Sequence, residues 1–326
     1  MAIHDFPARK SAWSAYWAAG SLNSCAGSFT GNYTGVISDF WRRAFASLPP
    51  QGRVLDIATG NGALPLMMSE HMGNGTGLQI DAVDMAMIAP QWHDPAAQPG
   101  IRFHAGVRME ALPFRDAIFD AVTSQYGLEY GNWPDALLEA SRVCDPQGGL
   151  ALVLHHPESV LVQVGRIEIA NHRFLSARYG LLEAARSVLP WMAAVRSGSM
   201  DPMEAPAAQA SKSAYNLAIL RLGEEILVNK APDLLVEARE RVHRLVSGAG
   251  PEDALVQLNS YVAALDAAAL RTAEMIDHAV DHARLDELHN VLSSTKPGWT
   301  VDVRPLAQAE GILGWAVLAS SGGRSA

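Results

Sequence analysis

Two glycines that follow an apolar run, together with an aspartate further along the chain, could bind a nucleoside. Residues 54–62 read Val-Leu-Asp-Ile-Ala-Thr-Gly-Asn-Gly, and Gly60 and Gly62 would let the backbone turn tightly and approach a ligand without a Cβ in the way. Asp84 ends a second apolar run, 24 residues after Gly60. A carboxylate there can accept hydrogen bonds from ribose hydroxyls. These residues predict a site for an adenosine cofactor.

A dinucleotide is one candidate for that cofactor, and the spacing of the glycines disfavours it. The dinucleotide motif G-x-G-x-x-G needs a third glycine for close packing of helix and strand. Pro65 stands at that position after Gly60 and Gly62. An NAD-dependent oxidoreductase is therefore the weaker of the interpretations that the turn allows.

The elements that must hold this turn follow from the hydrophobic pattern. Apolar runs alternate with helical stretches over residues 53–156, which implies right-handed crossovers and a parallel sheet covered on both faces. The predicted elements are strands over Arg53–Thr59, Leu78–Asp84, Ile101–Gly106, Ala117–Tyr126 and Gly149–His156, with helices over Ala63–His71 and Pro134–Val143. Two further strands, Gly298–Ala307 and Gly314–Ser320, have a short connection and predict an antiparallel pair that returns to the sheet.

Three parts of the chain follow from this pattern. Residues 1–50 are rich in aromatic side chains and predict an N-terminal helical cap. Residues 51–157 and 298–326 predict the cofactor-binding domain. Residues 158–297 show apolar positions at helical spacing, as at Leu235, Ala238 and Val242, and predict a helical insertion. We expect this insertion to act as a substrate lid, a dimerisation element or both.

The chain resembles the class I S-adenosylmethionine-dependent methyltransferases. Asp56, Gly60 and Gly62 match the first motif of that family, D/E-x-G-x-G-x-G, with Ala58 in place of the first glycine. Four later segments also match, at residues 82–85, 110–114, 118–122 and 138–149. The resemblance covers roughly Arg53–His156 and the final strand pair. Arg108 replaces the acid that commonly precedes the Leu-Pro-Phe run.

The resemblance implies an α/β, Rossmann-like fold, with a seven-stranded, mostly parallel sheet whose last strand is antiparallel. It also implies S-adenosyl-L-methionine as cofactor, with Asp84 on the ribose and residues 58–62 at the methionine moiety. Glu110, or backbone near Met109, would recognise the adenine. The expected cofactor-binding residues from these motifs are Asp56, Ala58, Gly60, Gly62, Asp84, Met85, Met109, Glu110 and Gln125.

Aromatic residues of the N-terminal segment could cap the cofactor. The faces of aromatic rings attract a sulfonium cation by roughly 0.5–2 kcal/mol. We choose Trp17 and Tyr33 as contacts; the alternative is a helix pinned to the core by large side chains.

Methyl transfer from a sulfonium needs alignment of the acceptor, and a base only where the acceptor must lose a proton. His155 and His156, after the strand that ends at the cofactor edge, are the candidate bases. Tyr126 and Glu129, after the fourth strand, are further catalytic candidates. His278 and His282 are four residues apart and predict a solvated face of one helix. We expect no metal there.

The function expected from these features is methylation of a hydroxyl or amine on a small, apolar or aromatic metabolite, for example from secondary metabolism. Residues 123–126 read Thr-Ser-Gln-Tyr, which is not the N/D-P-P-Y signature of nucleic-acid amino-methylation. A catalytically silent module that binds S-adenosylmethionine is an alternative. A third possibility is that the insertion chiefly makes a homodimer.

The composition limits which partners and which cellular compartment we expect for this protein. The 326 residues carry a formal charge of -9, and only four of the 25 basic residues are lysines, which disfavours nucleic acid. The apolar runs are too short for a membrane span, and Met1–Lys10 shows no secretion signal. Two cysteines, Cys25 and Cys144, suit a reducing compartment. We therefore expect a cytoplasmic protein with a small-molecule acceptor.

Overall fold

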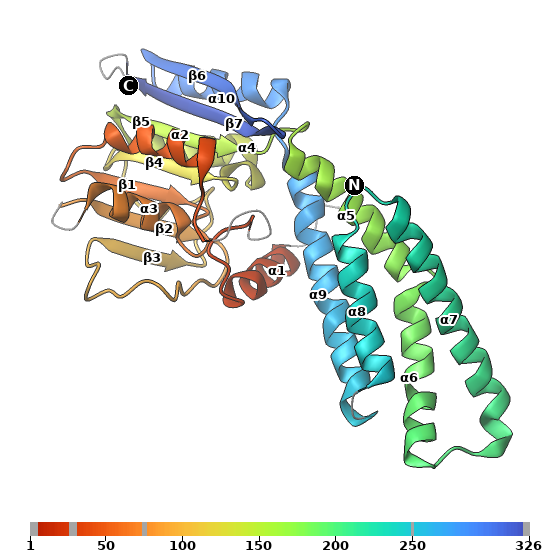
Figure 1. Ribbon diagram of the computed structural model, residues 1–326. Helices are drawn as coiled ribbons and strands as arrows, with labels where there is room; N and C mark the ends of the chain where they lie inside the picture. Colours follow the sequence, from red (N-terminus) through yellow and green to blue (C-terminus); the bar gives the residue numbers. More distant parts are fainter. Residues whose placement is uncertain (1–5, 26–30, 74–76, 249–250, 322–326) are drawn as a thin grey trace. The chain divides into compact units, whose positions relative to one another are not determined.

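The computed structural model describes residues 6–25, 31–73, 77–248 and 251–321 (Figure 1). Residues 1–5 and 26–30 of the predicted cap and 322–326 of the predicted cofactor-binding domain lie outside the described residues. The chain separates into two compact units. Met1–Val162 with Glu274–Ala326 is here called the sheet unit, and Gln163–Ala273 the helical unit.

The sheet unit is built on one seven-stranded sheet, whose order is β3-β2-β1-β4-β5-β7-β6. Its strands are β1 (Arg53–Ile57), β2 (Gln79–Asp84), β3 (Ile101–Ala105), β4 (Phe119–Gln125), β5 (Cys144–Leu154), β6 (Trp299–Gln308) and β7 (Gly311–Ser321). Strands β1 to β5 pair in parallel, and β7 runs antiparallel to both β5 and β6. The predicted Rossmann-like topology is confirmed.

The order of the central strands brings the site residues to one edge. β1 lies between β2 and β4, with Asp56 in register with Ala82 on one side and with Thr123 on the other. Because parallel strands end at the same edge of a sheet, Asp84 and Gln125 finish next to the turn that follows β1. The strand order also reverses at this point, which is where open α/β sheets bind ligands.

Helices cover both faces of the sheet (Figure 1). They are α2 (Gly35–Ala46), α3 (Ala63–Met72), α4 (Trp133–Val143) and α10 (His282–Thr295). α2 buries Ile37, Phe40, Trp41 and Phe45, which share one face of the helix, and packs with α3 in one core cluster. α4 and α10 pack in the other cluster, on the opposite face.

The first helix, α1 (Phe6–Ala18), belongs to the cavity described below rather than to either face of the sheet. The side chain of Asn61, in the turn after β1, donates to the backbone oxygens of Trp17 and Ser21, at 2.8 Å each. These bonds fix the end of α1 to the glycine turn. The residues between α1 and α2 that the structure describes include Tyr33, which is buried.

The helical unit consists of α6 (Leu181–Ser197), α7 (Ala205–Val228) and α8 (Asp233–Ser247), together with parts of α5 (Val160–Ser176) and α9 (Pro251–His278). α5 and α9 each cross a boundary between the units. Leu235, Ala238 and Val242, which have helical spacing in the sequence, are fully buried in the core of this unit. Among the described residues, no helix is both long enough and apolar enough to cross a membrane.

The helical unit is shorter than the insertion expected over residues 158–297. α10 falls within that expected range, but its Leu288 and Leu292 are fully buried in the core that α4 shares with the sheet. Helical periodicity shows that a face is buried and does not show against which core, so the sequence could not separate α10 from the insertion.

Candidate functional site

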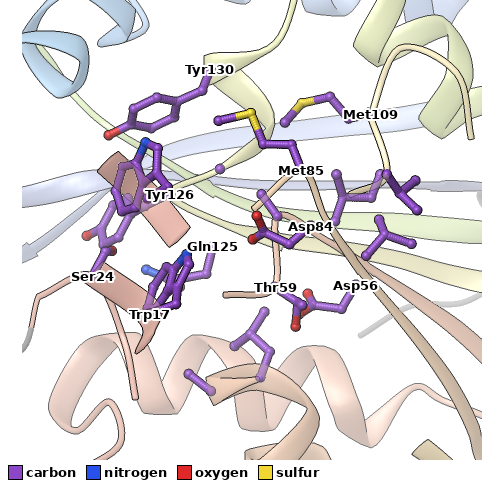
Figure 2. Close-up of a pocket in the computed structure, with 18 of the residues that line it drawn as sticks. Trp17, Ser24, Asp56, Thr59, Asp84, Met85, Met109, Gln125, Tyr126 and Tyr130 are labelled. Atoms are coloured by element: carbon purple, nitrogen blue, oxygen red, sulfur yellow. The ribbon is translucent and has the colours of Figure 1, made fainter. Parts of the chain in front are cut away.

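A cavity lies at the ends of β1, β2 and β4, with an empty space of about 750 Å³ that is partly open to solvent. Nine of the residues predicted from sequence line it: Trp17, Tyr33, Asp56, Ala58, Asp84, Met85, Met109, Gln125 and Tyr126. Figure 2 shows the rings of Trp17, Tyr126 and Tyr130 on one side of the space and the carboxylates of Asp56 and Asp84 on the other.

The turn after β1 needs its glycines. Gly60 and Gly62 have φ of 56° and 78°, in the left-handed region. A Cβ on Gly60 would lie 2.5 Å from the ring of Trp17, and one on Gly62 would lie 2.6 Å from the ring of Phe103. Both glycines therefore form the floor on which large aromatic side chains pack, although neither is itself in the lining of the cavity.

Two residues that are not glycine also have positive φ at this edge. Ala58, which replaces the first glycine of the motif, has φ of 56°, and Tyr126 at the end of β4 has φ of 51°. They are close together, because a Cβ on Gly127 would lie 2.4 Å from that of Ala58. Such strain costs about 1–3 kcal/mol per residue and is found mainly at functional sites.

Asp84 holds the two loops that border the cavity. Its Oδ2 accepts from the backbone N–H of Gly60 at 2.8 Å, and its Oδ1 accepts from that of Ala86 at 2.8 Å. Burial raises the pKa of Asp84 to about 6, although these two N–H groups lower it in part. Each carboxylate oxygen keeps a second lone pair that a ligand hydroxyl can use.

Asp56 is the second buried carboxylate of the cavity. Its Oδ1 accepts from the hydroxyl of Thr123 at 2.7 Å. Burial raises the pKa of Asp56 to about 7, and the nearby carboxylate of Asp84 adds to the rise. The hydrogen bond from Thr123 lowers this pKa in part. A cationic ligand in the cavity would favour the ionised form of both carboxylates.

Gln125 presents a hydrogen-bond donor to the cavity. Its Oε1 accepts from the indole N–H of Trp41 at 2.5 Å, which fixes the orientation of the amide. Its Nε2 is buried and, within the described part of the chain, has no hydrogen-bond partner. A buried donor without a partner is costly, so a ligand acceptor at this point would be favourable.

The aromatic wall comes mainly from α1. Trp13 and Trp17 are stacked, with ring centroids 5.7 Å apart, and the ring of Tyr130 meets Trp13 edge-on at 6.0 Å. Arg9, one turn before Trp13, also lines the cavity and donates to the backbone oxygen of Tyr130 at 2.8 Å. The wall combines apolar surface with π faces, which suit a cation.

The sequence of residues 54–148 matches the family model described as a methyltransferase domain. The chain contains a class I S-adenosylmethionine-dependent methyltransferase domain. This finding confirms the resemblance and sets aside the NAD-dependent oxidoreductase. The cofactor of the family is S-adenosylmethionine. The buried Asp84, Ala58 and Thr59 of the turn after β1, and the amide of Gln125 line a cavity that fits it.

Curated relatives match the same part of the chain. A demethylmenaquinone methyltransferase from Deinococcus radiodurans is 34% identical over 121 residues, which are 36% of this chain and 50% of that protein. A ubiquinone/menaquinone biosynthesis C-methyltransferase UbiE from Xanthomonas oryzae is 32% identical over 124 residues, 36% of this chain and 49% of that protein. The chain thus spans about half the length of these relatives.

Among solved structures, a putative methyltransferase from Bacillus halodurans aligns with a TM-score of 0.34. It is 22% identical in sequence and covers 43% of this chain and 60% of that chain.

Three of the predicted catalytic residues of the methyltransferase domain lie behind the cavity. Glu129 is fully buried, and its Oε1 is 2.7 Å from Nδ1 of His155 and accepts from the backbone N–H of His155 at 2.8 Å. His155 stacks on Tyr126 at 4.3 Å and meets Tyr130 edge-on at 5.8 Å. His156 packs against Trp315 instead, at 4.4 Å. Of the four catalytic candidates only Tyr126 lines the cavity, and its hydroxyl donates to the backbone oxygen of Leu313.

Glu110 also lies outside the cofactor cavity. It lines a neighbouring cavity, where its Oε1 accepts from the backbone N–H of Asn132 at 2.9 Å and its Oε2 is 3.3 Å from Nε of Arg108. Met85 and Met109 line both cavities. Of the two alternatives predicted for the adenine, Met109 therefore lines the cavity at the ends of β1, β2 and β4, and Glu110 does not.

Sequence reasoning did not select several residues of the site. Arg9 is one of them, although Arg9, Trp13 and Trp17 recur at intervals of four, which places them on one helix face. His278 was predicted to share a solvated helix face with His282, and that prediction is wrong: His278 ends α9, is half-buried in the neighbouring cavity and stacks on Tyr130 at 5.4 Å, whereas His282 begins α10. Burial, with the neighbouring cations of Arg9 and Arg284, lowers the pKa of His278 to about 4. The described residues contain no His, Cys, Asp and Glu group of three or more that could hold a metal.

Proposed function

We propose that this protein transfers a methyl group from S-adenosylmethionine to a small, apolar or aromatic acceptor. The observation that carries the proposal is the cavity at the ends of β1, β2 and β4, in which a buried carboxylate, a glycine turn and an aromatic wall converge within a methyltransferase domain. When bound, the cofactor supplies an electrophilic methyl group. The residues of the chain must then bind it, orient the acceptor and exclude water.

The residues of the cavity divide by the part of the cofactor that they would hold. The free lone pairs of Asp84 suit the ribose hydroxyls, and the turn at Ala58–Gly62 suits the methionine moiety. The Nε2 donor of Gln125 suits an oxygen of the ligand. The stacked rings of Trp13 and Trp17 would face the positive sulfur.

His155 and Glu129 act in this proposal as positioning residues. Their buried pair fixes the rings of Tyr126 and Tyr130, which line the cavity. A hydrogen-bonded pair behind an aromatic wall keeps the wall rigid, and a rigid wall keeps the acceptor aligned. His156, which packs on Trp315, would play no part in the chemistry.

The acceptor is a small molecule in this proposal, and its reacting atom is carbon, oxygen or nitrogen. The hydroxyl or amine expected from the sequence is extended to carbon because relatives carry the name C-methyltransferase. The low lysine content of the acidic chain supports a small molecule rather than a nucleic acid.

The test is an assay with methyl-labelled S-adenosylmethionine and a panel of small quinols, phenols and aromatic amines. The proposal predicts label in at least one acceptor together with release of S-adenosylhomocysteine. Binding of the cofactor without transfer to any acceptor would favour the silent module. Failure to bind S-adenosylmethionine at all would contradict the proposal.

A further inference from the structure

The outer face of α7 carries large apolar side chains that its own unit does not cover. Ala208, Tyr215, Ala218 and Leu222 face the core of the helical unit and are buried. On the other side of the helix Leu217 is 47% exposed, Leu220 60% and Leu227 85%. Monomeric proteins rarely leave such side chains in a continuous row on one helix, so this face predicts a partner.

The exposed residues of α7 follow a coiled-coil spacing. Seven positions of α7 are separated alternately by four and three residues, and all seven are exposed. They are positions 206, 210, 213, 217, 220, 224 and 227. Their side chains are Pro206, Ala210, Ser213, Leu217, Leu220, Glu224 and Leu227. Leu217, Leu220 and Leu227 are the large apolar members of this row and can pack against a second helix, whereas Ser213 and Glu224 interrupt it with polar side chains.

The charges of α7 select an antiparallel partner of the same kind. Lys212 lies in the first half of the helix, and Glu224 and Glu225 lie in the second half. A two-fold axis between Leu217 and Leu220 would bring Lys212 of one copy next to these carboxylates of the other. Arg221, the remaining charged residue of α7, would lie opposite Asn216 of the second copy. A parallel pair would instead place like charges opposite each other.

The same two-fold axis matches the apolar residues. It places Leu217 opposite Leu220 of the second copy, and Ala210 opposite Leu227, so that large and small side chains alternate along the seam. Antiparallel helices also have opposed macrodipoles, which is favourable. We propose that a second copy of this chain packs its α7 antiparallel on this face, to form a homodimer.

The length of the seam is adequate for a dimer. The 24 residues of α7 span roughly 36 Å at 1.5 Å per residue. Met203, which is 86% exposed just before α7, and Val228 at its end extend the apolar surface at both ends. The inference does not depend on methyl transfer.

Sedimentation of the full chain at several concentrations tests the proposal. The wild type should sediment as a dimer, and the double variant Leu217→Glu/Leu220→Glu as a monomer, because four carboxylates would face one another across the axis. Val256→Glu is the matched control, since Val256 is a 63% exposed residue of α9 in the same unit, outside α7. The control should remain a dimer, and circular dichroism should show unchanged helicity in all three proteins.

Disulfide trapping tests the direction of the helices. In a Cys25→Ser background, Ala210→Cys/Leu227→Cys should form a covalent dimer on oxidation, and Leu227→Cys alone should not, because the two copies of residue 227 would be roughly 26 Å apart along the helices. Cross-linking by Leu227→Cys alone would show a parallel pair and overturn the proposal. A wild type that is monomeric at all concentrations, or a dimer that survives the Leu217→Glu/Leu220→Glu change, would also overturn it.

Discussion

Asp84 has two roles in the proposed cofactor site. Its carboxylate already holds the backbone of Gly60 and Ala86, so it both shapes the turns and offers lone pairs to a ligand. An amide at this position could accept only through one oxygen. The ligand would then lose a charge-assisted hydrogen bond, which is worth more than a neutral one.

Asp84→Asn should therefore weaken the affinity for S-adenosylmethionine by at least about tenfold, or roughly 1.4 kcal/mol, in calorimetry. Asp81→Asn is the control, because Asp81 lies on the same strand and pairs with His104 outside the cavity. The control should bind the cofactor as the wild type does. Equal affinities for all three proteins would refute the assignment of Asp84 to the ribose.

The two buried carboxylates also make a prediction about pH. Burial raises the pKa of Asp56 to about 7, whereas an aspartate in the unfolded chain titrates near 4. As the pH rises from 4 to 7 the unfolded chain loses this proton first, so protonated Asp56 stabilises the fold at acidic pH and this contribution is lost as the pH approaches 7.

Asp56→Asn removes that titration while its amide oxygen can still accept from Thr123. Relative to the wild type, the free energy of unfolding of the variant should increase by more than about 1 kcal/mol between pH 5 and pH 8. Urea unfolding at several pH values measures this difference. Parallel curves for the two proteins would contradict the raised pKa.

At the scale of residues, the sequence indicated where a residue lies in the fold better than it indicated where its side chain points. Asp84 was predicted from its place at the end of a strand, and Gln125 from the family resemblance; both side chains line the cavity. His155 directly follows β5, but its ring turns toward the buried Glu129. That choice depends on a partner 26 residues away and left no local signal.

Among the elements, α1 both lines the cavity and is tied by a side chain to the glycine turn. Its carboxyl end is attached through the side chain of Asn61, and Trp17 packs on Gly60. Asn61→Ala should raise the rate of amide hydrogen exchange in α1 and leave the rates in β1 and β4 unchanged. Its affinity for S-adenosylmethionine should fall severalfold, because the aromatic wall would no longer be pre-organised.

Asn32→Ala is a suitable control, since Asn32 also bonds to the backbone near this turn, at Ala63, and contacts no part of α1 through that bond. It should leave exchange in α1 unchanged. Unchanged exchange in Asn61→Ala would show that packing of the tryptophans holds α1 without the amide.

The strands and their order were predictable because buried parallel strands read as apolar runs with turn residues between them. The attachment of α1 was not predictable. An asparagine between two glycines suggests a turn, and nothing in its neighbourhood in the sequence indicates that its side chain reaches residues 17 and 21.

For the whole molecule, the two proposed roles, cofactor binding and dimer formation, belong to different units. All residues that line the cofactor cavity belong to the sheet unit, and the proposed dimer seam belongs to the helical unit. S-Adenosylhomocysteine should therefore slow hydrogen exchange in α1 and in the turns after β1 and β2, and leave α6, α7 and α8 unaffected at constant protein concentration. Protection of those three helices would assign the helical unit a part in cofactor binding.

The most direct test of the central claim is a crystal structure of the protein with S-adenosylhomocysteine. The account predicts that the ribose hydroxyls lie within about 2.6–3.0 Å of the Asp84 carboxylate, and that the amino-acid part lies along the turn at Gly60. A nucleoside bound elsewhere, or bound in the cavity with its ribose away from Asp84, would contradict it.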